Sequence, residues 1–147
     1  MISHVDSDGR PTMVDVSGKT ATLRKAHART RIHLPESVAS ELKASGAVTK
    51  KGPVFHTAIV AGVMAAKRTH ELIPMCHPLL LSLVAVDLGP GAAGPDREGD
   101  QAWIDVEATV RTIGKTGVEM EALTAASVAA LTVYDMCKAA DRGIRIT

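Results

Sequence analysis

The stretch from Gly114 to Lys138 constrains the fold more than any other part of the chain. It begins as a glycine-bracketed turn, Gly114–Gly117, which offers flexible backbone and one cation. From there to Lys138 the chain has neither proline nor glycine, which predicts one long α-helix. Acidic residues in its first turn and Lys138 at its end suit the two ends of the helix dipole. Because most of its residues are alanine, leucine, valine or small polar types, we expect the helix to lie buried under a sheet.

Two charged residues stand out near the end of this helix. Asp135 and Lys138 are three positions apart, so their side chains reach the same side of the helix and can touch. An acid and a lysine in contact shift each other's pKa and could share a proton-transfer role. Residue chemistry alone favours the simpler interpretation, a surface ion pair near a helix end.

Composition and charge exclude several classes of protein. Aromatic residues make up only 2% of the chain, so a nucleic-acid binder would lack the platforms on which bases stack. The net charge of +1 provides no general field for a polyanion, and any anion site must be a local cluster. The two cysteines lack CxxC spacing, which is typical of reduced thiols in a cytoplasmic protein. Without a signal peptide or long apolar run, the sequence predicts one cytoplasmic domain over residues 1–147 that does not bind membranes.

The order of structural patterns predicts the fold class. Alternating segments and proline and glycine positions predict strand, helix, helix, strand, strand, helix and strand, after a loose tail over Met1–Pro11. The order is that of a ferredoxin-like α+β sandwich, an antiparallel sheet with helices packed on one face. Because Leu80–Leu88 has few polar residues, we expect an oligomer to cover the other face. The predicted segments are Thr20–Leu34, Pro35–Ala44, Val54–Glu71, Leu80–Leu88, Gln101–Ile113, the helix above and Gly143–Thr147, with a mobile link at Gly89–Asp100.

Two other places carry candidate functional residues. Two prolines bracket Cys76 and His77 in a stiff connection, which slightly favours a functional histidine over a packed one. The spacing of these two residues with His70 and Cys137 fits no structural zinc pattern, so we expect no metal site. Lys51 and Lys67 flank the second helix about 24 Å apart, too far to serve one small ligand from a single subunit.

Three blocks of the sequence resemble the MoaC-type cyclic pyranopterin monophosphate synthases of molybdenum cofactor biosynthesis. The resemblance covers nearly the whole chain and is weakest over Met1–Pro11 and Gly89–Asp100. The resemblance implies a further strand and a tail rich in Gly, Lys and Ser after the position of Thr147, which this sequence does not include. The blocks are Met13–Ser17 (MVDVS), Lys67–Leu79 (KRTHELIPMCHPL) and Gly114–Lys138.

The resemblance implies a function for each matching residue. Asp135 corresponds to the catalytic acid/base, Lys138 to its partner, and Lys51 to a further catalytic lysine. The implied substrate-binding residues are Met75, Cys76, His77, Glu119, Met120 and Lys67, with Asp15, Lys19, Arg24 and Glu121 as further polar positions.

The implied reaction is that of a phosphorus–oxygen lyase. It converts a 3′,8-cyclised 7,8-dihydro-GTP into cyclic pyranopterin monophosphate and releases pyrophosphate. The implied assembly is a homohexamer, a trimer of dimers, with the pocket between subunits. A shared pocket predicts that Asp135 and Lys51 act from different chains. No cofactor is implied, and whether Mg²⁺ accompanies the phosphates stays open.

Residue chemistry leaves three other hypotheses. A non-catalytic ferredoxin-like module could bind a small anion and regulate a partner, but it has no need to place Asp135 beside Lys138. A metal-dependent hydrolase would use His70, His77 and the acids, and metal analysis would identify it. A purely structural oligomer would have no need of the stiff Cys76–His77 loop.

Overall fold

The chain forms an antiparallel sheet covered on one side by helices. The structure, a computed structural model, describes residues 4–90 and 102–147. The predicted link over Gly89–Asp100 therefore lies almost wholly outside the described residues, as does the start of the predicted N-terminal tail. No helix in the described part of the chain is long and apolar enough to span a membrane.

The sheet is built around two long strands. β1 (Thr22–Leu34) and β5 (Ala102–Gly114) pair along their whole length, with Ala28 opposite Ala108. β4 (Leu83–Pro90) pairs with the other edge of β5, and the short β6 (Arg145–Ile146) pairs with β1. The order β4-β5-β1-β6 is antiparallel throughout and confirms the predicted ferredoxin-like arrangement.

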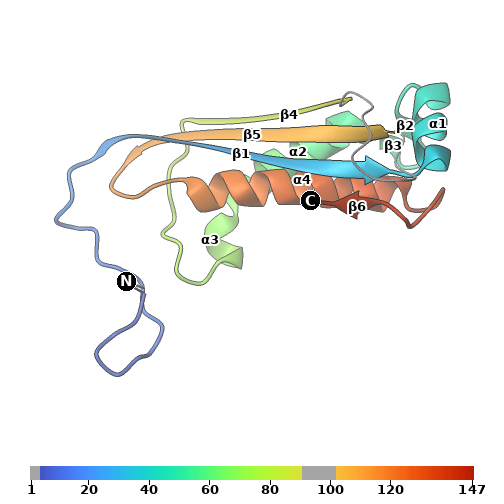
Figure 1. Ribbon diagram of the computed structural model, residues 1–147. Helices are drawn as coiled ribbons and strands as arrows, with labels where there is room; N and C mark the ends of the chain where they lie inside the picture. The colour runs from blue at the N-terminus through green and yellow to red at the C-terminus, as the bar shows by residue number, and fades with distance from the viewer. Residues whose placement is uncertain (1–3, 91–101) are drawn as a thin grey trace.

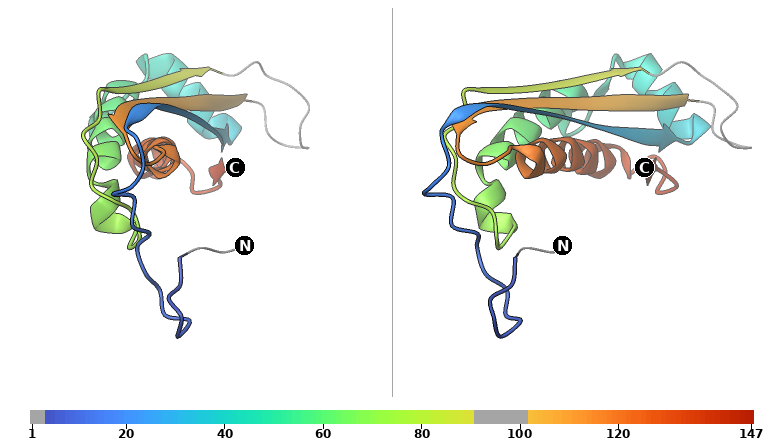
Figure 2. Two further views of the ribbon diagram at one scale, coloured as in Figure 1. Left: turned by 90° about the vertical axis from the view of Figure 1, so that its left-hand side faces the viewer. Right: turned by 60° about the vertical axis from the view of Figure 1, so that its left-hand side comes forward.

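Two helices cover one face of this sheet. α4 (Glu119–Cys137) lies across β1 and β5, and α2 (Val54–Lys67) packs beside it on β4 (Figures 1 and 2). α1 (Glu36–Ser45) follows β1 at the far end of the sheet. Each predicted helix is therefore present, and the long one lies under the sheet as expected.

The second predicted helix is shorter than the sequence indicated. α2 ends at Lys67 because Arg68 adopts φ −111° and ψ 11°, outside helical geometry. The Thr69 hydroxyl then donates to the Ala65 and Ala66 carbonyls, which satisfies the end of α2. A separate turn, α3 (Thr69–Leu72), follows.

A small hairpin also escaped prediction. β2 (Val48–Thr49) pairs with β3 (Gly52–Pro53), and a turn at Lys50–Lys51 joins them. Strands of two residues cannot show an alternating pattern, so sequence periodicity does not reveal them. Gly52, at φ 107°, supplies the left-handed backbone that this turn needs.

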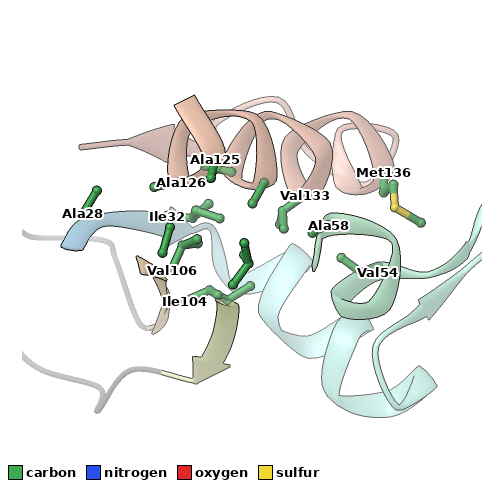
Figure 3. Packing of buried hydrophobic residues seen from close by; sticks show 14 of the residues in the cluster. Ala28, Ile32, Val54, Ala58, Ile104, Val106, Ala125, Ala126, Val133 and Met136 are labelled. Atoms are coloured by element: carbon green, nitrogen blue, oxygen red, sulfur yellow. The ribbon is translucent and has the colours of Figure 1, made fainter. Parts of the chain in front are cut away.

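The core is built mainly from small side chains. The buried face of α4 is rich in alanine, including Ala125 and Ala126, and packs on Ile32 and Val106 of the sheet (Figure 3). Such a face lets α2 approach closely. A Cβ added to Gly62 of α2 would lie 3.0 Å from the Ala125 carbonyl oxygen and 3.3 Å from the Ala129 Cβ.

Gly62→Ala is therefore expected to destabilise the protein. In an open helix this change adds up to about 1 kcal/mol of stability. Here the added methyl meets a backbone oxygen, and overpacking of a core costs about 1–3 kcal/mol, so the net effect is a loss of about 1–2 kcal/mol. Urea unfolding measures this change in the free energy of unfolding. Gly89→Ala is the matched control, because a Cβ there meets nothing within 4 Å. Equal stability of the two variants would contradict the close packing.

The other face of the sheet is polar along its centre. Asp105 accepts hydrogen bonds from Arg31 at 2.8 Å and Arg29 at 3.0 Å, and these ion pairs lower the pKa of its carboxyl. Apolar side chains are exposed only near one end of this face in the described chain, at Leu23, Leu83 and Ile113. The few polar residues of Leu80–Leu88 therefore do not represent the centre of this face, which is charged. The predicted oligomer itself stays a prediction.

Candidate functional site

Most of the predicted site residues fall into two groups at opposite ends of α4. Glu119, Met120 and Glu121 form its first turn, whereas Asp135 and Lys138 lie at its last turn and C-cap. Asp135 lies sixteen positions after Glu119 along the helix, about 24 Å by helical rise. Each end opens into its own cavity, and we name the two after their central carboxylates.

The Asp135 pocket is a cavity of about 500 Å³ at the C-terminal end of α4. The Lys51 ammonium donates to Asp135 Oδ2 at 2.8 Å, and the Lys138 ammonium donates to Oδ1 at 2.8 Å. Each carboxylate oxygen therefore holds one lysine. The cavity is lined by Val38, Glu41, Leu42, Thr49, Lys50, Lys51, Asp135, Met136, Cys137, Lys138, Ala139, Ala140 and Arg142.

Local structure explains how Lys51 reaches this site. Its backbone is held by the β2–β3 turn, where the Lys51 N–H donates to Thr49 Oγ1 at 3.2 Å. Its ammonium also donates to the Asp135 main-chain carbonyl at 3.1 Å. That carbonyl belongs to the last turn of α4, where the helix dipole favours a cation. Because Lys51 and Asp135 touch within one chain, the expectation that they act from different subunits is wrong.

The electrostatics of the cluster are dominated by its two cations. Hydrogen bonds from Lys138 and then Lys51 lower the pKa of the Asp135 carboxyl to about 2. The carboxyl is therefore ionised throughout the neutral range. Burial raises the pKa of the neighbouring Cys137 thiol to about 11. That thiol stays protonated near neutral pH and is not a nucleophile there.

The Glu121 pocket is a cavity of about 270 Å³ at the N-terminal end of α4. Glu121 is only 4% exposed, and this burial raises the pKa of its carboxyl. Burial likewise raises the pKa of the Cys76 thiol, so it too is a poor nucleophile. The cavity is lined by His4, Val14, Val16, Lys19, Met75, Cys76, His77, Leu79, Thr116, Gly117, Glu119, Met120 and Glu121.

Two local features shape the Glu121 pocket. The His77 ring donates from Nε2 to the Val14 carbonyl at 2.9 Å, which ties the proline-bracketed loop to the N-terminal segment. Glu119 folds back over Gly117, where any Cβ would collide with its carboxylate. The atoms in this contact are the end of a flexible side chain, so a Cβ at Gly117 would displace the Glu119 carboxylate from its place in the pocket.

The structure brings together most, but not all, of the predicted residues. Asp15 lies beside the Glu121 pocket, where its carboxylate accepts the Ser17 N–H at 2.8 Å and its pKa is lowered mainly by that bond. Lys67 lies apart, at a groove of about 460 Å³ beside Leu79–Val84. Arg24 lies on β1 and lines none of these three cavities.

The sequence did not identify some of the residues that line the two pockets. Lys50 and Arg142 join the Asp135 pocket, and Thr116 and Gly117 join the Glu121 pocket. The glycines and single cation of the Gly114–Gly117 turn could have marked Thr116 and Gly117 as candidates. No feature of the sequence marked Arg142 as a site residue. The described residues contain no group of three or more His, Cys, Asp or Glu side chains arranged to hold a metal ion.

Known proteins of similar sequence match nearly the whole chain. The chain is 51% identical over 145 residues to a cyclic pyranopterin monophosphate synthase from Xanthomonas oryzae pv. oryzae, a match that covers 99% of this chain and 83% of that protein. It is 52% identical to the protein of the same name from Roseiflexus castenholzii and 54% identical to that from Methylobacterium sp. (strain 4-46), covering 99% of this chain and 86% and 85% of theirs. A model of the MoaC family matches residues 13–147. The chain therefore belongs to the MoaC family.

Proposed function

We propose that the chain is a cyclic pyranopterin monophosphate synthase acting in molybdenum cofactor biosynthesis. Its substrate is a 3′,8-cyclised 7,8-dihydro-GTP, and its products are cyclic pyranopterin monophosphate and pyrophosphate. The observation that carries the proposal is the Asp135 carboxylate held between Lys51 and Lys138 in a pocket with an excess of cations. The names and close identity of the relatives support it independently.

The charge of the Asp135 pocket suits phosphoryl transfer. Its lining carries four cationic residues, Lys50, Lys51, Lys138 and Arg142, against the two acids Glu41 and Asp135. In the proposed step a substrate hydroxyl oxygen attacks the α-phosphorus and the α–β anhydride bond breaks. A lysine ammonium of the cluster donates a proton to the departing pyrophosphate, and the amine left behind takes the proton of the hydroxyl. The cyclic phosphate and pyrophosphate are then formed together, which makes the enzyme a phosphorus–oxygen lyase. Cations stabilise the charge that gathers on the departing pyrophosphate.

The geometry favours a particular division of labour within the cluster. A carboxyl with a pKa of about 2 is a weak base and is never protonated near neutral pH, so it is poorly matched to proton transfer. An ammonium group that the carboxylate orients can donate a proton to nitrogen, carbon or oxygen. We therefore assign proton transfer to Lys51 and Lys138, and we assign Asp135 the task of holding them. This revises the expectation of Asp135 as the acid/base.

The Glu121 pocket suits the base of the substrate. Met75 and Met120 offer apolar, adaptable surface for a flat ring, and the carboxylates of Glu119 and Glu121 can accept its N–H groups. Lys19 supplies a cation at the edge of the same cavity.

A second copy of the chain would unite the two pockets. α4 is rigid and keeps its two ends about 24 Å apart, so one reacting ring cannot touch both within a subunit. Exposed apolar residues on the outer faces of α2 and α4 offer surface for such an assembly: Val60, Met64, Leu123 and Leu131. These observations support an active site between subunits, and we propose the assembly that the resemblance implies, a homohexamer built as a trimer of dimers. Because the substrate derives from GTP, we place the reaction in the cytoplasm.

A single-turnover assay of the unmodified chain tests the proposal. Excess protein is mixed with the cyclised dihydro-GTP, and pyrophosphate release is followed with and without EDTA. Release of one pyrophosphate per substrate is expected. Binding without release would favour the regulatory module, and release of inorganic phosphate that EDTA abolishes would favour the metal-dependent hydrolase. The EDTA arm also shows whether Mg²⁺ accompanies the phosphates.

A further inference from the structure

One wall of the Glu121 pocket has no regular secondary structure. It is the segment Met13–Lys19, from which Val14, Val16 and Lys19 line the cavity. The segment runs beside the β5–α4 turn and the connection from α3 to β4 at one end of the molecule (Figures 1 and 2). Its internal hydrogen bonds are local, from Ser17 N–H to the Asp15 carboxylate and from Lys19 N–H to the Val16 carbonyl. They shape the segment but do not attach it to the domain.

Two side chains from the rest of the site attach this wall. His77 donates from Nε2 to the Val14 carbonyl at 2.9 Å, and the Lys115 ammonium donates to the Ser17 carbonyl at 2.7 Å. Within residues 4–90 and 102–147, these are the hydrogen bonds that join Met13–Lys19 to other parts of the chain. The segment is therefore held at two points, one near each of its ends.

Lys115 occupies a favourable position for this contact. It belongs to the turn between β5 and α4, and the next two residues of that turn, Thr116 and Gly117, line the same pocket. The lysine therefore links two walls of one cavity. Its positive charge also contributes to the lowered pKa of Asp15, after the dominant Ser17 hydrogen bonds, so the ammonium lies near that carboxylate.

We propose that Lys115 is a positioning residue, which holds Met13–Lys19 against the Glu121 pocket so that Lys19 faces the substrate. The proposal rests on the function proposed above. Lys115 acts through the backbone of Ser17 and makes no contact of its own with the substrate. Without it the segment keeps its attachment at His77 and its chain connection to β1, but Ser17 loses the hydrogen bond that holds the backbone between them.

Substitution of Lys115 tests this proposal through substrate affinity. Lys115→Met keeps the length of the side chain and removes the donor. We expect KM for the cyclised dihydro-GTP to rise about tenfold, the size expected for a hydrogen bond from a charged group. We expect kcat to change by less than about threefold, because the Asp135 pocket is untouched. Lys115→Arg keeps a cationic donor and should restore most of the affinity.

Hydrogen exchange provides a readout that needs no turnover. In the free protein, the backbone amides of Ser17–Lys19 should exchange at least about tenfold faster in Lys115→Met than in the unmodified chain, while those of α4 stay protected. Lys25→Met is the matched control, because Lys25 lies exposed on β1 and lines none of the three cavities. It should change neither KM nor exchange.

The outcomes separate this proposal from the proposed function. Unchanged exchange at Ser17–Lys19 in Lys115→Met would overturn the positioning role, whether or not the chain turns over. A rise in KM without faster exchange would overturn it too, since Lys115 would then touch the substrate directly. An unmodified chain that releases no pyrophosphate contradicts the proposed function, yet the exchange comparison still decides the role of Lys115. If Lys115→Met does not fold, Lys115→Gln serves the same comparison.

Discussion

Asp135→Asn is expected to slow pyrophosphate release by at least about a hundredfold, the lower end of what positioned proton transfer contributes. The change keeps the shape of the side chain and removes its charge. Lys51 and Lys138 would then lose the carboxylate that holds each of them at 2.8 Å, and two like charges would face each other without a counterion. A single-turnover measurement with saturating protein reports this step directly, because weaker binding cannot limit it.

Two comparisons make the Asp135→Asn result specific. Asp87→Asn is the matched control, since Asp87 is an exposed acid on β4 that lines none of the three cavities and should leave the rate unchanged. Substrate binding by Asp135→Asn, followed by equilibrium dialysis, should be retained through the Glu121 pocket. A rate within threefold of the unmodified chain would show that Asp135 and its two lysines form only a surface ion cluster without a catalytic role.

Mixed oligomers are expected to show that the two pockets come from different chains. Asp135→Asn and Glu121→Gln change opposite ends of α4, and each alone should be nearly inactive. If each active site takes one end of α4 from each of two subunits, random assortment leaves roughly a quarter of the sites with both native ends. Activity should therefore return to about that fraction after the two variants are unfolded together and refolded.

The chain offers a matched control for this experiment. Lys51 and Asp135 touch within one chain, so Asp135→Asn mixed with Lys51→Ala cannot produce a native Asp135 pocket. This pair should recover no activity under identical refolding. Recovery by neither pair, with subunit exchange verified by mass spectrometry, would show that both ends of α4 act from one chain. Recovery by both pairs would contradict the cluster that the structure shows.

Much of the fold was predictable because its signals are local. β1 and β5 alternate, and α4 lacks glycine and proline, so their existence and order follow from the sequence. The break at Arg68 was missed because a single residue with a non-helical backbone leaves no gap in the pattern of side chains. The charged centre of the open sheet face was also missed. It depends on the register that brings Arg31 beside Asp105, and register is a long-range property.

The sequence predicted which residues belong to the site but not how they are arranged in space. The resemblance to the family named Asp135, Lys138 and Lys51, and the structure gathers these three in one pocket. The contact between Lys51 and Asp135 joins residues that are far apart in sequence, so no local pattern reveals it. Likewise, the Glu121 pocket depends on the Met13–Lys19 segment crossing from the other end of the chain. The hexamer and the role of each site residue stay predictions.

The rigidity of α4 also bears on how activity could be controlled. A helix of this length, buried along its alanine face, does not bend to bring Glu121 and Asp135 together. Under the proposed function, an isolated subunit thus carries two half-sites and no whole one. Closing a loop could not switch such an enzyme on, but the meeting of two subunits could. The rate would then depend on the concentration of subunits. Below the dissociation constant of the assembly, few complete active sites would form.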